Sequence, residues 1–182
     1  MKRFTLIRHL LAPAIIGALA IALAGVANAS PPVPEVPSEI AVPEGHQLFL
    51  VGHAVGVQIH TCTPAGWSFV GPRANLYDDN GHLFATHFGG PSWQARDGSL
   101  VRAAVDGRVT PDPTAIPWLR LAVNFAAEGP DGDRLLRTTY IQRIATVGGL
   151  APAAADCNEN TVGTTEEVPY TADYTFWKAT GN

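Results

Sequence analysis

The sequence predicts an all-β protein, a single-domain antiparallel sandwich or barrel of about nine short strands with an N-terminal Pro-rich arm. Short stretches in which apolar and polar residues alternate recur along the chain, and turn signals separate them at intervals of roughly 8–12 residues. The chain holds 18 glycines and 15 prolines, which favour turns. Beyond the N-terminal segment, no window keeps the apolar spacing of an amphipathic helix.

The first segment, residues 1–29, has the three parts of a secretory signal peptide. A basic start (residues 2–8) precedes the uncharged apolar run Leu10–Val26, and small residues at 27 and 29 permit cleavage after Ala29. We therefore expect a secreted protein, extracellular or periplasmic, with no membrane span after cleavage. An uncleaved membrane anchor is the alternative, and Pro13 weakens it because proline interrupts a helix.

Two further regions follow the signal. Residues 30–43 are rich in proline, so we expect an extended, polyproline-like arm that either lies on the domain or is loose in solvent. Residues 44–182 then form the all-β domain, in which we see no internal repeat.

The charge balance excludes several partners. The signal segment contains three of the twelve basic residues and none of the sixteen acidic ones, so the remaining chain has nine basic residues against sixteen acidic ones. Lys178 is its single lysine. Such an acidic protein has no electrostatic footprint for nucleic acid or for an anionic membrane surface.

Alternation places the strands in order along the chain. In residues 54–62, for example, Val55, Val57 and Ile59 share one face, and Gln58 and His60 share the other. The predicted strands are residues 47–51, 54–62, 67–70, 74–77, 82–88, 93–96, 100–105, 118–126, 134–147 and 171–178. Their clearest apolar faces are Leu119, Leu121, Val123 and Phe125 in one strand and Ala172, Tyr174 and Phe176 in another.

Two turns predict hairpins. Residues 78–81, Asp-Asp-Asn-Gly, connect the strands at 74–77 and 82–88, and residues 97–99, Asp-Gly-Ser, connect those at 93–96 and 100–105. The oxygen-rich loops 78–81 and 131–133 are also candidates for calcium, but neither has the full ligand series with a distal glutamate. Turn chemistry is the favoured explanation.

The chain after the signal has two cysteines, Cys62 and Cys157. In an exported protein an even pair predicts a disulfide. Two free thiols or two soft-metal ligands are the alternatives. No C-x-x-C motif is present, so a thioredoxin-like redox role has no support.

Motifs for metals, cofactors and nucleophiles are missing. His53 and His60, like His82 and His87, are separated by odd spacings, which place the two members of each pair on opposite faces of a strand. There is no His-Glu-x-x-His motif, no phosphate loop and no dinucleotide fingerprint. Ser68 lies inside a strand pattern without the Gly-x-Ser-x-Gly spacing. We predict no metal and no cofactor.

One tract, residues 87–99, contains several groups with chemical potential. His87, Trp93, Gln94 and Asp97 are candidates for a shared pocket, in which His87 is a general base or ligand and Asp97 orients it. The favoured explanation is two consecutive hairpin turns, with Trp93 as a core anchor and His87 bonded to backbone, because glycine and proline in this tract serve turns. The other tryptophans, Trp67, Trp118 and Trp177, are either stacking platforms for a sugar or core residues, and the second is commoner.

Several segments together resemble the domain of unknown function 3455 family, small secreted proteins of bacteria and fungi. The segments that carry the resemblance are residues 42–46, 56–62, 74–78, 86–93, 97–99, 116–119, 141–143, 146–149 and 168–174. The resemblance covers nearly the whole chain after the signal and implies no particular activity. His60 and Phe88 stand where relatives usually carry tyrosine, which argues against a family-wide catalytic role for His60.

Two functions are consistent with these observations. The first is a secreted, disulfide-stapled β domain that binds a ligand, such as a small molecule or glycan, or takes part in the cell envelope without catalysis. The second is a small extracellular enzyme with a pocket around His87, Trp93 and Asp97. The failed motif searches favour the first, and the density of polar groups in residues 87–99 favours the second.

Overall fold

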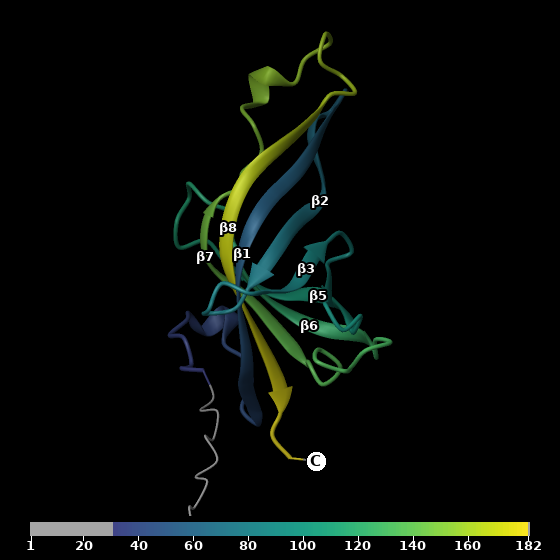
Figure 1. The fold of residues 1–182 in the computed structure, drawn as a ribbon. Helices are drawn as coiled ribbons and strands as arrows, with labels where there is room; N and C mark the ends of the chain where they lie inside the picture. Colours follow the sequence, from purple (N-terminus) through teal and green to yellow (C-terminus); the bar gives the residue numbers. More distant parts are fainter. Residues whose placement is uncertain (1–30, 182) are drawn as a thin grey trace, which may run out of the picture.

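The computed structural model describes residues 31–181, and the predicted cleavage point after Ala29 lies outside them. Eight antiparallel strands are paired in sequence order, and pairing of the first with the last closes them into a barrel (Figure 1). The predicted all-β class is confirmed. The strands are β1 (His46–Thr63), β2 (Gly66–Tyr77), β3 (Leu83–Phe88), β4 (Ser92–Ala95), β5 (Leu100–Val109), β6 (Trp118–Ala127), β7 (Tyr140–Gly148) and β8 (Thr165–Ala179).

The strands are fewer and longer than predicted, because two predicted breaks are bridged. The predicted strands 47–51 and 54–62 form the single strand β1, with a register shift between Leu48 and Leu50. Likewise, β2 continues through Gly71 and Pro72, where the sequence indicated a break. Pro72 is tolerated because it lies just beyond the ladder with β3, so at this point β2 has only β1 as a neighbour.

Two strand starts also differ from the prediction. The segment 134–139 is not part of β7 but a turn, in which Leu136 and Thr138 donate backbone hydrogen bonds to Asp133 and Leu135. At the other end, β8 begins at Thr165 and passes through Pro169. Pro169 lies one residue beyond the end of the ladder with β7, which again leaves β1 as the only neighbour.

Inward-facing side chains of the barrel form one core. Trp93, Leu76 and Phe176 are among its fully buried members. The predicted apolar face of β8 is confirmed, since Ala172, Tyr174 and Phe176 all belong to this core. In β6, Leu119 and Leu121 also point inward, but Phe125 is on the outside, where the guanidinium carbon of Arg102 lies 5.1 Å from its ring centre. A register shift after Arg102 in the pairing with β5 accounts for this reversal.

The Pro-rich arm lies on the outer wall of the barrel. It forms a short 3-10 turn, η1 (Ser38–Ile40), and Ile40 is fully buried. The carbonyls of Ile40 and Ala41 accept hydrogen bonds from Gln142 and Arg120. Gly107 allows this close approach, because a Cβ atom there would lie 2.4 Å from the carbonyl oxygen of Glu39.

Three strands extend beyond the rest of the barrel and form what we call the projection: residues 57–63 of β1, 66–72 of β2 and 165–169 of β8. Figure 1 shows them rising above the other strands, with the β7–β8 loop at their tip. That loop contains η2 (Ala154–Asp156) and is joined to β1 by the Cys62–Cys157 disulfide. The predicted disulfide is therefore confirmed.

The disulfide closes a long loop, because its two cysteines are 95 positions apart in the sequence. By the chain-entropy model, a loop of this size stabilises the fold by roughly 4–5 kcal/mol. Disulfides are typical of oxidising, extracytoplasmic compartments. Within residues 31–181, no helix is long and apolar enough to span a membrane.

Candidate ligand-binding cavity

A cavity of about 350 Å³ lies at the end of the barrel from which the projection rises. All eight strands contribute residues to its wall, together with the loops that precede β6 and follow β7. Its volume is at the lower end of the range for small-molecule sites. A second hollow, formed by residues 136–139 and the two terminal strands, contains none of the unpartnered buried atoms described below.

The wall on β1 is unexpectedly polar. Gln58 and His60, which are 3% and 6% exposed, point inward, whereas Val55 on the opposite face is 57% exposed. Gly149 permits Gln58 to pack closely against the β7–β8 loop, because a Cβ at residue 149 would lie 3.0 Å from the Gln58 Cγ. The strand thus turns its polar face toward the cavity and its apolar face toward solvent.

Three buried polar atoms have no hydrogen-bond partner in the described part of the chain, and all three belong to residues of the cavity wall. They are Nε2 of Gln58, Nδ1 of His60 and Nε1 of Trp93. An unsatisfied buried polar group destabilises a fold by about 1–3 kcal/mol. These three residues belong to β1 and β4, so two regions of the same wall carry unsatisfied polar groups.

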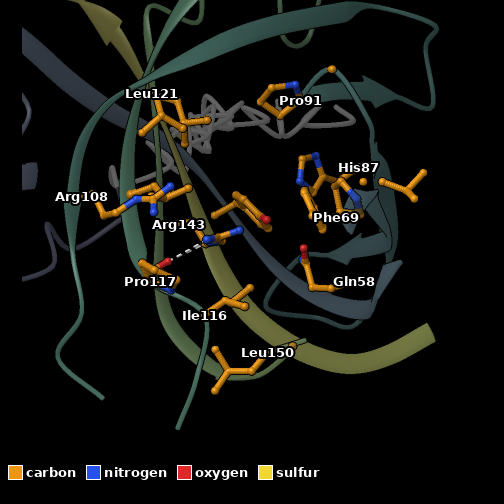
Figure 2. Close-up of a pocket in the computed structure, with 18 of the residues that line it drawn as sticks. Gln58, Phe69, His87, Pro91, Arg108, Ile116, Pro117, Leu121, Arg143 and Leu150 are labelled. Carbon is orange, nitrogen blue, oxygen red and sulfur yellow. Dashed lines mark hydrogen bonds between the residues drawn. The ribbon is translucent and has the colours of Figure 1, made fainter. Parts of the chain in front are cut away.

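Arg143 supplies a positive charge to the same cavity. Its Nε and Nη2 atoms donate to the carbonyl oxygen of Pro117 at 3.1 and 2.8 Å, as the dashed line in Figure 2 indicates. The loop that contains Pro117 is anchored on β7, because Thr146 Oγ1 donates to the Ile116 carbonyl at 2.6 Å. The guanidinium also lies within hydrogen-bonding reach of the Tyr174 hydroxyl.

The charge of Arg143 has no carboxylate partner in the part of the chain that the structure describes. Within residues 31–181, Arg143 makes no ion pair, and the cavity wall contains no aspartate or glutamate. Arg108, which is exposed, adds a second guanidinium to the wall. The cavity is thus positive in a chain whose formal net charge is −4.

His87 is buried and stacked on Trp93, with ring centres 4.3 Å apart and planes within 12°. Its Nδ1 donates to the Ser92 carbonyl at 2.9 Å, so Nε2 carries the free lone pair. Desolvation lowers the pKa of His87 to about 3, the Ser92 hydrogen bond opposes this shift, and the charge of Arg143 adds to it. The imidazole is neutral at physiological pH.

Two tyrosines complete the interior near Arg143. Tyr174 lies opposite Arg143 in the β7–β8 pairing, and its hydroxyl is 3.3 Å from that of Tyr170. Desolvation raises the pKa of both phenols, and in each case the nearby charge of Arg143 partly offsets the shift. Both hydroxyls are therefore neutral and do not cancel the positive charge of Arg143.

Of the four residues that the sequence offered as candidates for a shared pocket, the structure brings two to one cavity. His87 and Trp93 line the cavity, whereas Gln94 and Asp97 are not part of its wall. Gln94 follows Trp93 in β4 and so points to the outside, where it is exposed. Asp97 lies in the β4–β5 turn, where it accepts hydrogen bonds from Ser99 and from the backbone of Arg134.

The predicted interaction, in which Asp97 orients the His87 ring, is therefore not present, and each of the two residues has a partner of its own. The partner of the His87 ring is the Ser92 carbonyl, and the Asp97 carboxylate connects its turn to the loop before β7. Desolvation by itself raises the pKa of Asp97. The hydrogen bonds from Ser99 and Arg134 outweigh this effect, so the pKa lies below its usual value.

Sequence reasoning did not single out Gln58, Arg143 or Tyr174, and it set His60 aside. The alternation in β1 contained a signal, because Gln58 and His60 fall together on one face. Arg143 had no such signal, since a single arginine in a strand is usually at the surface. The described residues contain no group of three or more His, Cys, Asp or Glu side chains that could hold a metal ion.

The fold and the site define a class of protein: a small, disulfide-linked, eight-stranded β-barrel with a cavity of ligand size at one end. Residues 43–178 match the family described as Protein of unknown function (DUF3455), and the chain belongs to this family. No curated protein and no solved structure matches the chain.

Proposed function

We propose that this protein is an extracytoplasmic binding module that holds a small molecule in the cavity of its barrel. The observation that carries the proposal is the position of the unpartnered atoms of Gln58, His60 and Trp93, all from residues of one cavity wall. A buried polar atom is costly without a partner, and a ligand that bonds to it recovers that cost.

Binding is favoured over catalysis by the chemistry of the wall. The described residues that form it include no serine, threonine, cysteine, aspartate or glutamate. With its pKa near 3, His87 is a weak base at neutral pH, and Asp97 does not orient it. The groups present donate and accept hydrogen bonds, which suits recognition of a ligand.

The extracytoplasmic location rests on two features. The N-terminal segment reads as a signal peptide with cleavage after Ala29, and the cysteines are paired. Intact-mass analysis of the protein recovered after export tests this part of the proposal. We expect a chain that begins at Ser30 and has lost two hydrogens, whereas an unprocessed N-terminus would contradict it.

The binding function is tested by NMR of labelled protein against a library of sugars, amino acids, organic acids and neutral apolar compounds. A ligand should shift the indole N–H signal of Trp93 and the side-chain amide signals of Gln58. Trp67 and Trp177 are controls, because their indole groups already donate to the Ala153 carbonyl and to Gln142. A library in which no compound moves the Trp93 and Gln58 signals would refute the proposal.

A further inference from the structure

We infer that the cavity takes an amphipathic organic anion, with a carboxylate head at Arg143 and an apolar body directed to the rim. This inference rests on the proposed binding function and names the class of its ligand. It is supported by three features of the wall: the charge, the predominance of donors in its interior and the apolar character of its outer edge.

The charge of the wall favours an anion. Arg143 and Arg108 are its charged residues, and no carboxylate is present in the described wall to pair with them. A guanidinium that is partly removed from water and has no counter-charge is unfavourable. An anionic ligand supplies that counter-charge, whereas a cationic ligand meets repulsion.

The geometry of Arg143 leaves room for a carboxylate. Its Nε and Nη2 atoms share the Pro117 carbonyl, which occupies one edge of the guanidinium. A guanidinium has five N–H donors. The Pro117 carbonyl uses two of them and the Tyr174 hydroxyl lies within reach of a third, so two remain to donate to the oxygens of a carboxylate. In Figure 2 the guanidinium points into the ring of labelled residues, with Gln58 and His87 across from it.

The unpartnered atoms in the interior match an acceptor. The side-chain Nε2 of Gln58 and the indole Nε1 of Trp93 only donate hydrogen bonds. A carboxylate accepts bonds at two oxygens and can satisfy several donors at once. The neutral His87 ring provides an acceptor, Nε2, for a hydroxyl or amide group on the same ligand.

The outer edge of the cavity is apolar. Phe69, Val70, Val105 and Leu150 all line the cavity and are all exposed to solvent. Phe69 and Val70 belong to β2 in the projection, so one side of this rim is formed by a strand. The disulfide joins the neighbouring strand β1 to the β7–β8 loop. An apolar body that covers these side chains removes their surface from water, which stabilises the complex.

Isothermal titration calorimetry with matched ligand pairs tests the inference. The pairs are octanoate with octanamide and 4-phenylbutyrate with 4-phenylbutanamide, so that the head group changes and the body does not. We expect at least one carboxylate to bind about tenfold or more tightly than its amide. In the Arg143→Gln variant this preference should disappear, and in the Arg96→Gln control, at an exposed arginine outside the cavity wall, it should remain.

A second variant keeps the test decisive if Arg143→Gln does not fold. Gln58→Met removes a donor near the head, retains both arginines and should weaken carboxylate binding several-fold. Equal affinity for acid and amide would overturn the inference while leaving the binding function intact. Failure of both acids to bind would also overturn it, and the library experiment would then decide separately whether the cavity binds anything.

Discussion

The side-chain amide of Gln142 donates to the backbone carbonyl of Ile40 at 2.7 Å, and this bond joins the Pro-rich arm to the barrel. The other end of the same amide, Oε1, accepts hydrogen bonds from Thr175 at 2.9 Å and Trp177 at 3.0 Å. Gln142 is fully buried on the outer face of the sheet. One side chain thus satisfies three buried groups, one of them in the arm.

Replacing Gln142 with methionine should destabilise the protein by about 2–4 kcal/mol, because the Ile40 carbonyl and the Trp177 indole lose a buried partner. Urea denaturation measures the change. Gln94→Met is the matched control, since Gln94 is exposed and should change stability by less than about 0.5 kcal/mol. Equal effects of the two substitutions would contradict the proposed role of the network.

Replacing Gln58 with methionine should have the opposite effect on the ligand-free protein. Its Nε2 atom is buried without a partner, so removing it relieves a desolvation penalty of about 1–2 kcal/mol. The melting temperature should therefore rise, while binding of an acceptor ligand weakens. A fall in melting temperature would show that Gln58 stabilises the ligand-free barrel.

His87 should make the fold sensitive to acid. Its pKa is about 3 in the folded protein and 6.5 in the unfolded chain, so the unfolded state binds the extra proton between these values. Stability therefore falls as the pH drops below 6.5, and the contribution lost is about 2–3 kcal/mol at pH 4.5. His87→Gln should remove this fall in the free energy of unfolding. Urea denaturation between about pH 4 and pH 7, the range of the expected effect, measures it.

His53 should contribute a pH dependence of opposite sign. Its ring nitrogens contact Asp79 at 2.9 Å and Asp173 at 2.7 Å, and the hydrogen bonds to these two residues raise its pKa above 6.5 against a smaller desolvation effect. The stabilisation is complete below pH 6.5 and is lost as the pH rises through the raised pKa.

Melting temperatures at a series of pH values check this contribution. His53→Gln should lose the decline above pH 6.5, and so should a variant in which Asp79 and Asp173 are both asparagine. Because His53 is half-exposed, the effect should shrink in high salt. A decline of unchanged size in both variants would assign it to other groups.

Asp97 should affect stability and leave ligand binding unchanged. Asp97→Asn weakens the bonds that join Ser99 and Arg134, so we expect a loss of about 1–2 kcal/mol that shrinks as the pH falls through the lowered pKa. Calorimetry of the folded variant should give wild-type affinity. A specific loss of affinity would revive the pocket that the sequence suggested around His87 and Asp97.

Much of the fold was predictable because its causes are local. Turn residues placed the hairpins at 78–81 and 97–99, and alternation identified the inward face Ala172, Tyr174 and Phe176. One of the two predicted breaks that the structure bridges was expected because Pro72 usually ends a strand, and nothing local shows that β2 has a single neighbour there. Strand pairing between distant segments decides that.

By itself, the sequence determined the strand-forming segments, the signal-like N-terminus and the cysteine pair. These follow from periodicity, composition and turn chemistry, which act over a few residues. Only the tertiary structure decided which face of β1 points inward, and with it that Gln58 and His60 meet Arg143 at one cavity. The reason is that alternation defines two faces of a strand, whereas closure of β1 against β8 selects the one that encloses the interior.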